Sequence, residues 1–292
     1  MTIDVRDKRI NEIVDPSAPL EIVASGFHFT EGPVWLAEQH KLVFSDIPGN
    51  QMHIWSAKGD VVSYRKPSHM ANGNFRDRKG RLLTCEHATS VVSREEPDGS
   101  RIVLASRYQG KELNSPNDII ERADGTIFFT DPTYGRVAEY GVERPQELAF
   151  RGVYRVDEDG RNLTLLADDF VQPNGLCFSL DARKIYINDS ERLHIRLFDL
   201  SVAGDLSNGR VFAETVGEGL GSPDGLKIDR KGNVFCASQG GIHIFDPEGR
   251  CLGVIRVPEE TANFGFGDDD RCTLFITAST SLYRIRLKQP GI

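Results

Sequence analysis

Six polar side chains, at similar intervals along the chain, have the donor chemistry of a site for a hard cation. These lead residues, each placed before a short apolar run, are Glu31, Asn72, Asn117, Asn174, Asp224 and Asn263. The set has two carboxylates and four carboxamides, with no histidine, cysteine, lysine or arginine. Such oxygen donors suit Ca²⁺ and, less specifically, Mg²⁺ or Mn²⁺. Two carboxylates would neutralise one divalent ion, whereas without a cation they would repel each other.

The lead residues begin six copies of one sequence pattern. In the fifth copy, Pro223-Asp224-Gly225-Leu226 is followed by KIDRKGNVFCAS, which reads as a strand, a turn with Asp, Gly and basic residues, and a second strand. Successive lead residues are 41, 45, 57, 50 and 39 positions apart. A repeat of about 40–50 residues built from strands is typical of a propeller. We therefore predict an all-β fold, a six-bladed β-propeller of four-stranded antiparallel blades.

The propeller is expected to occupy residues 20–292 as a single domain, after an N-terminal extension over residues 1–19. Residues 20–27 (LEIVASGF) precede the first copy, and residues 282–287 (LYRIRL) end the last one. We expect one of these two segments to supply an outer strand to the other's blade, because this closes the ring and removes open sheet edges. Residues 138–150 are expected to form a helical or irregular insertion, either a lid over the pocket or an oligomer contact.

The propeller geometry places the lead residues around one mouth of the central channel, because the innermost strand of each blade lines that channel. Two strands of about 6 residues and a short turn return the chain to the same face. An outer ring is therefore expected around this mouth, at Asp46, His87, Asp131, Asp189, Ser238 and Ser279. A turn role explains any single Asn or Asp before Gly, but it does not require a glutamate at position 31.

Composition excludes several classes of function. The chain has 292 residues, 39% hydrophobic and 27% charged, with a net charge of -8 and a pI of about 5.5. This predicts a soluble globular protein without nucleic-acid or membrane partners. The N-terminus lacks the features of a secretory signal, so we expect a cytoplasmic protein. The five cysteines form no CxxC pair, which argues against a zinc ribbon or a disulfide framework. The sequence makes no prediction of the oligomeric state.

Five ordered stretches resemble the gluconolactonase/regucalcin (senescence marker protein) family of six-bladed propellers, most of all its bacterial gluconolactonase branch. They are Glu31-Gly-Pro-Val-Trp35, Asn72-Gly-Asn74, Ser115-Pro-Asn-Asp118, Pro173-Asn-Gly-Leu176 and Ser222-Pro-Asp-Gly225. The resemblance implies a divalent ion in the channel, usually Ca²⁺, with Mg²⁺, Mn²⁺ or Zn²⁺ as alternatives.

The resemblance also assigns roles to individual residues. Glu31, Asn174 and Asp224 match the metal ligands of the family. Asn117, which we include in the expected ligand set, matches a position that either ligates the ion or holds substrate and a metal-bound water. Asn72 and His87 match positions around the substrate pocket. Asn263 is assigned to the same substrate rim, although the following loop, NFGFGD, departs from the family pattern.

The hypothesis that follows is a metal-dependent lactonase opening a sugar lactone such as an aldonolactone, its small-molecule partner. The ion would polarise the lactone carbonyl and stabilise the oxyanion. Asp224 is the favoured catalytic base for the attacking water, and His87 is the alternative, since imidazole titrates near neutral pH. Hydrolysis of another ester or a phosphoester on the same platform stays open, as does a non-catalytic calcium-binding propeller.

Overall fold

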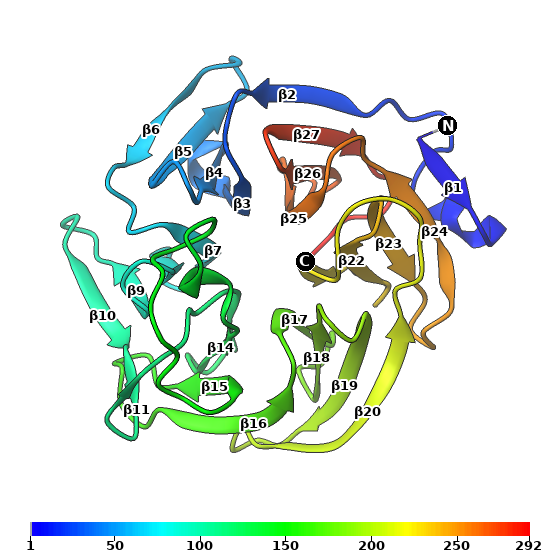
Figure 1. Ribbon diagram of the computed structural model, residues 1–292. Helices are drawn as coiled ribbons and strands as arrows, with labels where there is room; N and C mark the ends of the chain where they lie inside the picture. Colours follow the sequence, from blue (N-terminus) through cyan, green and yellow to red (C-terminus); the bar gives the residue numbers. More distant parts are fainter. Residues whose placement is uncertain (1) are drawn as a thin grey trace.

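The computed structural model describes residues 2–292 and forms a closed ring of antiparallel sheets around a central channel (Figure 1). Six four-stranded blades follow one another along the chain, which confirms the predicted propeller. The innermost strands are β3 (Thr30–Leu36), β7 (Ala71–Arg76), β13 (Ile119–Glu121), β17 (Pro173–Phe178), β21 (Leu226–Ile228) and β25 (Thr261–Gly267).

Each inner strand pairs with a second strand, which pairs in turn with a third. The second strands are β4 (Lys41–Asp46), β8 (Leu82–Glu86), β14 (Ile127–Asp131), β18 (Lys184–Asp189), β22 (Val234–Ser238) and β26 (Thr273–Ala278). The third strands are β5 (Gln51–Ser56), β9 (Val91–Glu95), β15 (Arg151–Val156), β19 (His194–Leu200), β23 (Gly241–Phe245) and β27 (Ser281–Arg286).

The outer strands complete the blades, and one of them comes from the start of the chain. They are β6 (Val61–Arg65), β10 (Arg101–Ala105), β16 (Thr164–Phe170), β20 (Leu206–Glu214), β24 (Cys251–Arg256) and β2 (Glu21–Ser25). Strand β2 pairs with β27, with Ile22 opposite Tyr283. The N-terminal segment thus completes the last blade, as expected for a ring closed without an open edge.

Residues 2–19 pack against the fifth blade. Strand β1 (Ile3–Val5) pairs with β24 and adds a fifth strand to that sheet. The 3-10 helix η1 (Lys8–Glu12) buries Ile10 in a core cluster that includes Ile255. Other short elements are the hairpin β11 (Arg107–Tyr108) and β12 (Lys111–Glu112), and the 3-10 helices η2 (Ala37–Gln39) and η3 (Tyr134–Arg136). Among residues 2–292, no helix is long and apolar enough to cross a membrane.

Hairpin turns and interblade packing follow from the repeated pattern. In the turn between β21 and β22, the Asp229 carboxylate accepts hydrogen bonds from the backbone N–H groups of Lys231 and Asn233, and Gly232 adopts a φ of 82°. Glycine takes this left-handed conformation without steric cost.

Neighbouring blades are joined by aromatic contacts such as Trp35 stacked on Phe275, with centroids 5.6 Å apart. Such pairs contribute about 0.5–1.5 kcal/mol beyond area burial.

Glycine follows the lead residue directly in four blades, at Gly32, Gly73, Gly175 and Gly225. A Cβ atom at any of these positions would collide with the next blade's innermost segment. Because glycine has no side chain, the inner segments can approach one another closely and narrow the channel at this level. This constriction, formed at Gly32, Gly73, Gly175 and Gly225, is called the waist below. The third blade has Asp118 at this position, which brings a buried carboxylate into the waist.

Candidate active site

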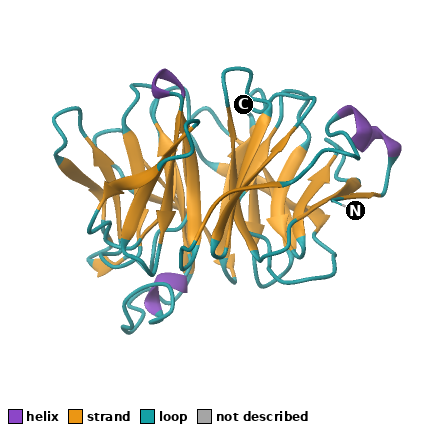
Figure 2. Ribbon diagram, turned by 90° about the horizontal axis from the view of Figure 1, so that it is seen from above, coloured by secondary structure: helices purple, strands orange, loops and turns teal. Residues whose placement is uncertain are grey.

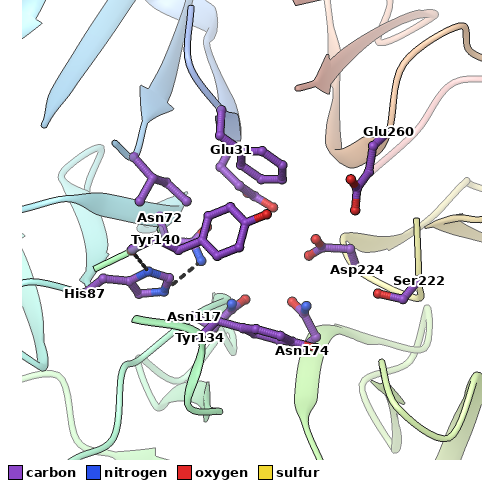
Figure 3. A pocket seen from close by; sticks show the side chains of 12 residues that line it. Glu31, Asn72, His87, Asn117, Tyr134, Tyr140, Asn174, Ser222, Asp224 and Glu260 are labelled. Carbon is purple, nitrogen blue, oxygen red and sulfur yellow. Dashed lines mark hydrogen bonds between the residues drawn. The ribbon is translucent and has the colours of Figure 1, made fainter. Parts of the chain in front are cut away.

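Five of the six lead residues line one cavity at the mouth of the channel (Figure 3). They are Glu31, Asn72, Asn117, Asn174 and Asp224. They lie in the innermost segments of five consecutive blades. Except for Asp224, each of these residues is at most 4% exposed. The cavity has a volume of about 80 Å³. Together with His87, which also lines the cavity, the structure thus brings together all four residues expected as metal ligands and two more expected as substrate contacts.

Other lining residues were not predicted from the repeat. These are Phe29, Ile47, Tyr134, Tyr140, Ser222 and Glu260. They lie in the loops before and after the inner hairpins or in the segment after β14, where the strand pattern gives no register. Phe29, Ser222 and Glu260 have a sequence signal in their nearness to a lead residue, and Tyr140 has one in its place within the 138–150 insertion.

Three oxygen atoms at the cavity are buried and have no hydrogen-bond partner among residues 2–292. They are Asn72 Oδ1, Asn174 Oδ1 and Asp224 Oδ1. A buried polar atom left unsatisfied costs about 1–3 kcal/mol, so three around one cavity indicate a missing electropositive partner. The Asn174 amide nitrogen donates to Ser190 Oγ at 3.1 Å, which leaves its oxygen to face the cavity.

Buried charges around the cavity also point to a cation. Burial raises the pKa of Glu31, and the charge of Asp118 contributes to this shift. Burial also raises the pKa of Asp224, with further contributions from the charges of Glu31 and Asp118. Burial raises the pKa of Asp118, while the Lys227 ammonium opposes this shift. These three carboxylates and the Lys227 ammonium leave two negative charges when all are ionised, and Glu260 in the cavity lining adds a third. A divalent cation would offset most of this charge.

Asn263, expected at the substrate rim, lies behind Glu31 and does not line the cavity. Its Nδ2 donates to Glu31 Oε2 at 2.9 Å, and its Oδ1 accepts from Lys227 Nζ at 3.1 Å. The backbone N–H of Gly32 also donates to Glu31 Oε2. Asn263 therefore orients the Glu31 carboxylate and links it to the half-buried Lys227.

His87 lines the cavity and fixes the orientation of Asn72 (Figure 3). Burial lowers the pKa of His87 to about 4, so its imidazole is neutral at neutral pH. Its Nδ1 lies 2.8 Å from the Tyr140 carbonyl oxygen, which can only accept, so Nδ1 carries the proton. Its Nε2 must then accept from the Asn72 amide group, 3.0 Å away. Asn72 Oδ1 consequently faces the cavity.

The rest of the expected outer ring has a different role. The end of each second strand lies on the mouth side as predicted, but the side chains of Asp46, Asp131 and Asp189 do not line the cavity. They accept hydrogen bonds from backbone N–H groups in the loops before the lead residues. Asp46 accepts from His28 and Phe29, Asp131 from Asn114 and Ser115, and Asp189 from Val171 and Gln172. Ser238 and Ser279 also lie outside the lining. These carboxylates hold the loops that position the site.

The insertion over residues 138–150 is irregular, one of the two forms expected, and forms a wall of the cavity through Tyr140. The Tyr140 ring meets Phe29 edge-on with centroids 5.0 Å apart. Arg144 donates to the His87 carbonyl oxygen at 3.0 Å and pairs with Glu112 at 3.2 Å. Arg136, which precedes the insertion, pairs with the same Glu112 carboxylate at 2.8 Å. Arg136, which is buried, and Arg144, which is half-buried, thus hold this wall of the cavity against the blades.

The donor set fits a hard cation better than a soft one. Residues 2–292 contain no group of three or more His, Cys, Asp or Glu side chains arranged to hold a metal ion. The convergent oxygen donors are instead two carboxylates with carboxamides, and oxygen-only sets of this kind suit Ca²⁺. No lysine or arginine lines the cavity among the described residues. The arrangement can therefore bind a cation beside a space for a small neutral molecule.

Comparison with known proteins gives a consistent result. Residues 29–280 match the SMP-30/gluconolactonase/LRE-like region family. The chain is 35% identical to a gluconolactonase from Zymomonas mobilis, over 97% of this chain and 85% of that protein. It superimposes on a gluconolactonase structure from Xanthomonas campestris with a TM-score of 0.91 and 35% identity, covering 98% and 95% of the two chains.

A more distant structure shares the fold. It is a calcium-binding protein, regucalcin, from Agrobacterium tumefaciens, with a TM-score of 0.77 and 17% identity over 94% of this chain and 97% of that one.

Proposed function

The chain belongs to the SMP-30/gluconolactonase/LRE-like family, and we propose that it is a lactonase that opens a sugar lactone with the help of a bound divalent ion. Its resemblance to gluconolactonases over nearly the whole chain supports lactone hydrolysis. The observation that carries the metal proposal is the convergence of unpartnered buried oxygens on one cavity with an excess of negative charge.

Glu31, Asn117, Asn174 and Asp224 would hold the ion, and Ca²⁺ is the ion that best fits their oxygen donors. The calcium-binding regucalcin with the same fold supports this choice. When bound, the ion supplies Lewis-acid polarisation of the lactone carbonyl and lowers the pKa of a neighbouring water. Asn263 keeps the Glu31 carboxylate oriented toward this position through its 2.9 Å hydrogen bond.

Asp224 is the base in this proposal. One oxygen of the Asp224 carboxylate would hold the ion and the other would face the water. Water oxygen adds to the lactone carbonyl carbon, and its proton passes to this second Asp224 oxygen. The ring C–O bond then breaks, and Asp224 returns its proton to the leaving oxygen to give the hydroxy acid. His87 is disfavoured as the base because both of its ring nitrogens are already engaged, one by Tyr140 and one by Asn72.

The walls of the cavity suit a polyhydroxylated ring. Tyr140 offers an apolar face, while Ser222 and Glu260 offer hydrogen-bonding groups on the opposite side (Figure 3). Phe29, which packs against Tyr140, adds a second apolar face. Burial and the neighbouring Glu139 raise the pKa of Glu260. A carboxylate accepts hydrogen bonds from sugar hydroxyls, so we assign Glu260 to substrate recognition. The absence of cationic side chains in the described lining weighs against a phosphoester substrate.

The proposal is tested by turnover of glucono-1,5-lactone with and without chelator. Protein treated with chelator should fall to the rate in buffer, and Ca²⁺ or another divalent ion should restore activity. Full activity in thoroughly chelated protein would contradict the metal proposal. A protein that binds the ion but opens no lactone faster than buffer would instead favour a non-catalytic calcium-binding propeller.

A further inference from the structure

The channel has a second, larger chamber beyond the waist. The same inner strands that carry the lead residues end in this chamber, which has a volume of about 460 Å³. Strand β17, for example, brings Asn174 to the small cavity and Phe178 to the large one. Ile292 also lines the large chamber, and the C-terminus lies at one face of the ring in Figure 2. The proposed lactonase chemistry makes no use of this space.

The walls of this second chamber are mostly apolar. Its lining includes Val34, Ile120, Phe178, Ile228 and Phe266, contributed by five different inner strands. Pockets of about 300–1,000 Å³ with apolar walls and a few placed polar groups are typical of small-molecule sites. The chamber therefore has the size and the surface to take up a small apolar body.

The polar group at the inner end of the chamber is a cation. Lys227 Nζ donates to Asn263 Oδ1 and lies 5.4 Å from the centroid of the Phe264 ring. No carboxylate oxygen of residues 2–292 lies within 4.0 Å of this ammonium. The ammonium lowers the pKa values of Asp118 and Glu31 from a distance but forms no direct ion pair, so an anion on the chamber side can contact it directly.

The remaining charges in the lining strengthen this positive balance. Its two acidic residues are already paired, Asp77 with Arg81 at 2.7 Å and Glu121 with Arg78 at 3.5 Å. Arg271 at the rim has no carboxylate within 4.0 Å among the described residues. Its guanidinium donates instead to a backbone carbonyl oxygen.

We propose that this second chamber is a binding site for an amphiphilic carboxylate, a molecule with one acid group and an apolar chain or ring. The acid group pairs with Lys227 at the inner end, and the apolar body packs against Ile120, Phe178 and Phe266. Arg271 at the rim attracts the anion as it enters. The site is separate from the lactone cavity, because the waist of close-packed glycines lies between them.

Decanoate and the neutral 1-decanol are the matched probes for this site. Calorimetry follows binding, and the fluorescence of Trp35, which lines the chamber, reports where the ligand lies. Wild-type protein should bind decanoate more tightly than decanol. In Lys227→Met the apolar stem is kept and the charge is lost, so decanoate affinity should fall roughly tenfold or more while decanol binding is little changed.

A second variant keeps the test decisive if Lys227→Met does not fold. Ile120→Trp fills the chamber from its wall and should abolish binding of both probes. The proposal is overturned if decanoate fails to bind wild-type protein, if Lys227→Met binds it as tightly as wild type, or if Ile120→Trp binds it unchanged. Competition between decanoate and glucono-1,5-lactone would also overturn it, because it would place the probe in the lactone cavity.

Discussion

Replacing Asp224 by asparagine should abolish turnover and at the same time stabilise the metal-free protein. The change keeps the shape of the side chain and removes its charge and its ability to accept a proton. General-base catalysis typically contributes 10²–10⁴-fold in rate, so kcat/KM for glucono-1,5-lactone should fall by about that factor. A steady-state assay at saturating Ca²⁺ measures this loss.

The gain in stability follows from the buried charges. Burial, Glu31 and Asp118 raise the pKa of Asp224, so ionisation of this carboxyl opposes folding, and stability is lost as the pH rises through the raised pKa. Two carboxylates about 4 Å apart repel by roughly 4 kcal/mol at an effective dielectric constant of 20. Because partial protonation limits this repulsion, the chelated variant should gain on the order of 1–3 kcal/mol. The corresponding rise in Tm is about 2–6 °C.

A matched control separates this effect from general damage. Asp229→Asn lies in the same blade and changes a fully buried carboxylate that accepts backbone hydrogen bonds from Lys231 and Asn233. It should destabilise the protein by about 1–3 kcal/mol and leave the stabilisation by Ca²⁺ intact. Chelated Asp224→Asn protein that melts below chelated wild type, or retains wild-type turnover, would refute the reasoning.

Three further predictions concern single residues. Burial lowers the pKa of His87 to about 4, so wild-type stability should decline as the pH falls from about 6.5 toward 4, by up to roughly 3 kcal/mol. Urea unfolding of His87→Phe should lack this decline, and an unchanged slope would assign it to another group. Glu31→Gln should weaken Ca²⁺ binding in calorimetry by roughly 10–100-fold, and an unaltered titration would remove Glu31 from the ligand set. Glu260→Ala should raise KM for glucono-1,5-lactone about tenfold and leave the unsubstituted δ-valerolactone unaffected, whereas an equal rise for both would argue against hydroxyl recognition.

The repeat alone was enough to predict the propeller and the convergence of its lead residues. Strand periodicity and hairpin length determine which end of each inner strand lies at the mouth. Glu31 and Asp224, 193 positions apart in sequence, can therefore be assigned to one cavity from the sequence. The closing strand could be predicted as well, because an open ring would leave two sheet edges unpaired.

Side-chain roles at strand ends could not be predicted in the same way. Asp131 and His87 occupy equivalent places after their hairpins, yet Asp131 accepts backbone N–H groups and His87 reaches the cavity. The difference depends on the loops that precede each inner strand, whose conformation no repeat encodes. Asn263 likewise appears equivalent to the other lead residues, but the Lys227 side chain holds it behind Glu31.

The location of the metal ion tests the central claim most directly. Crystals soaked in Mn²⁺, or grown with Ca²⁺, can be examined by anomalous diffraction. We expect one peak in the small cavity, bounded by oxygens of Glu31, Asn174 and Asp224 at about 2.1–2.6 Å. A peak elsewhere in the channel, or none in this cavity under conditions in which the protein opens a lactone, would contradict the account.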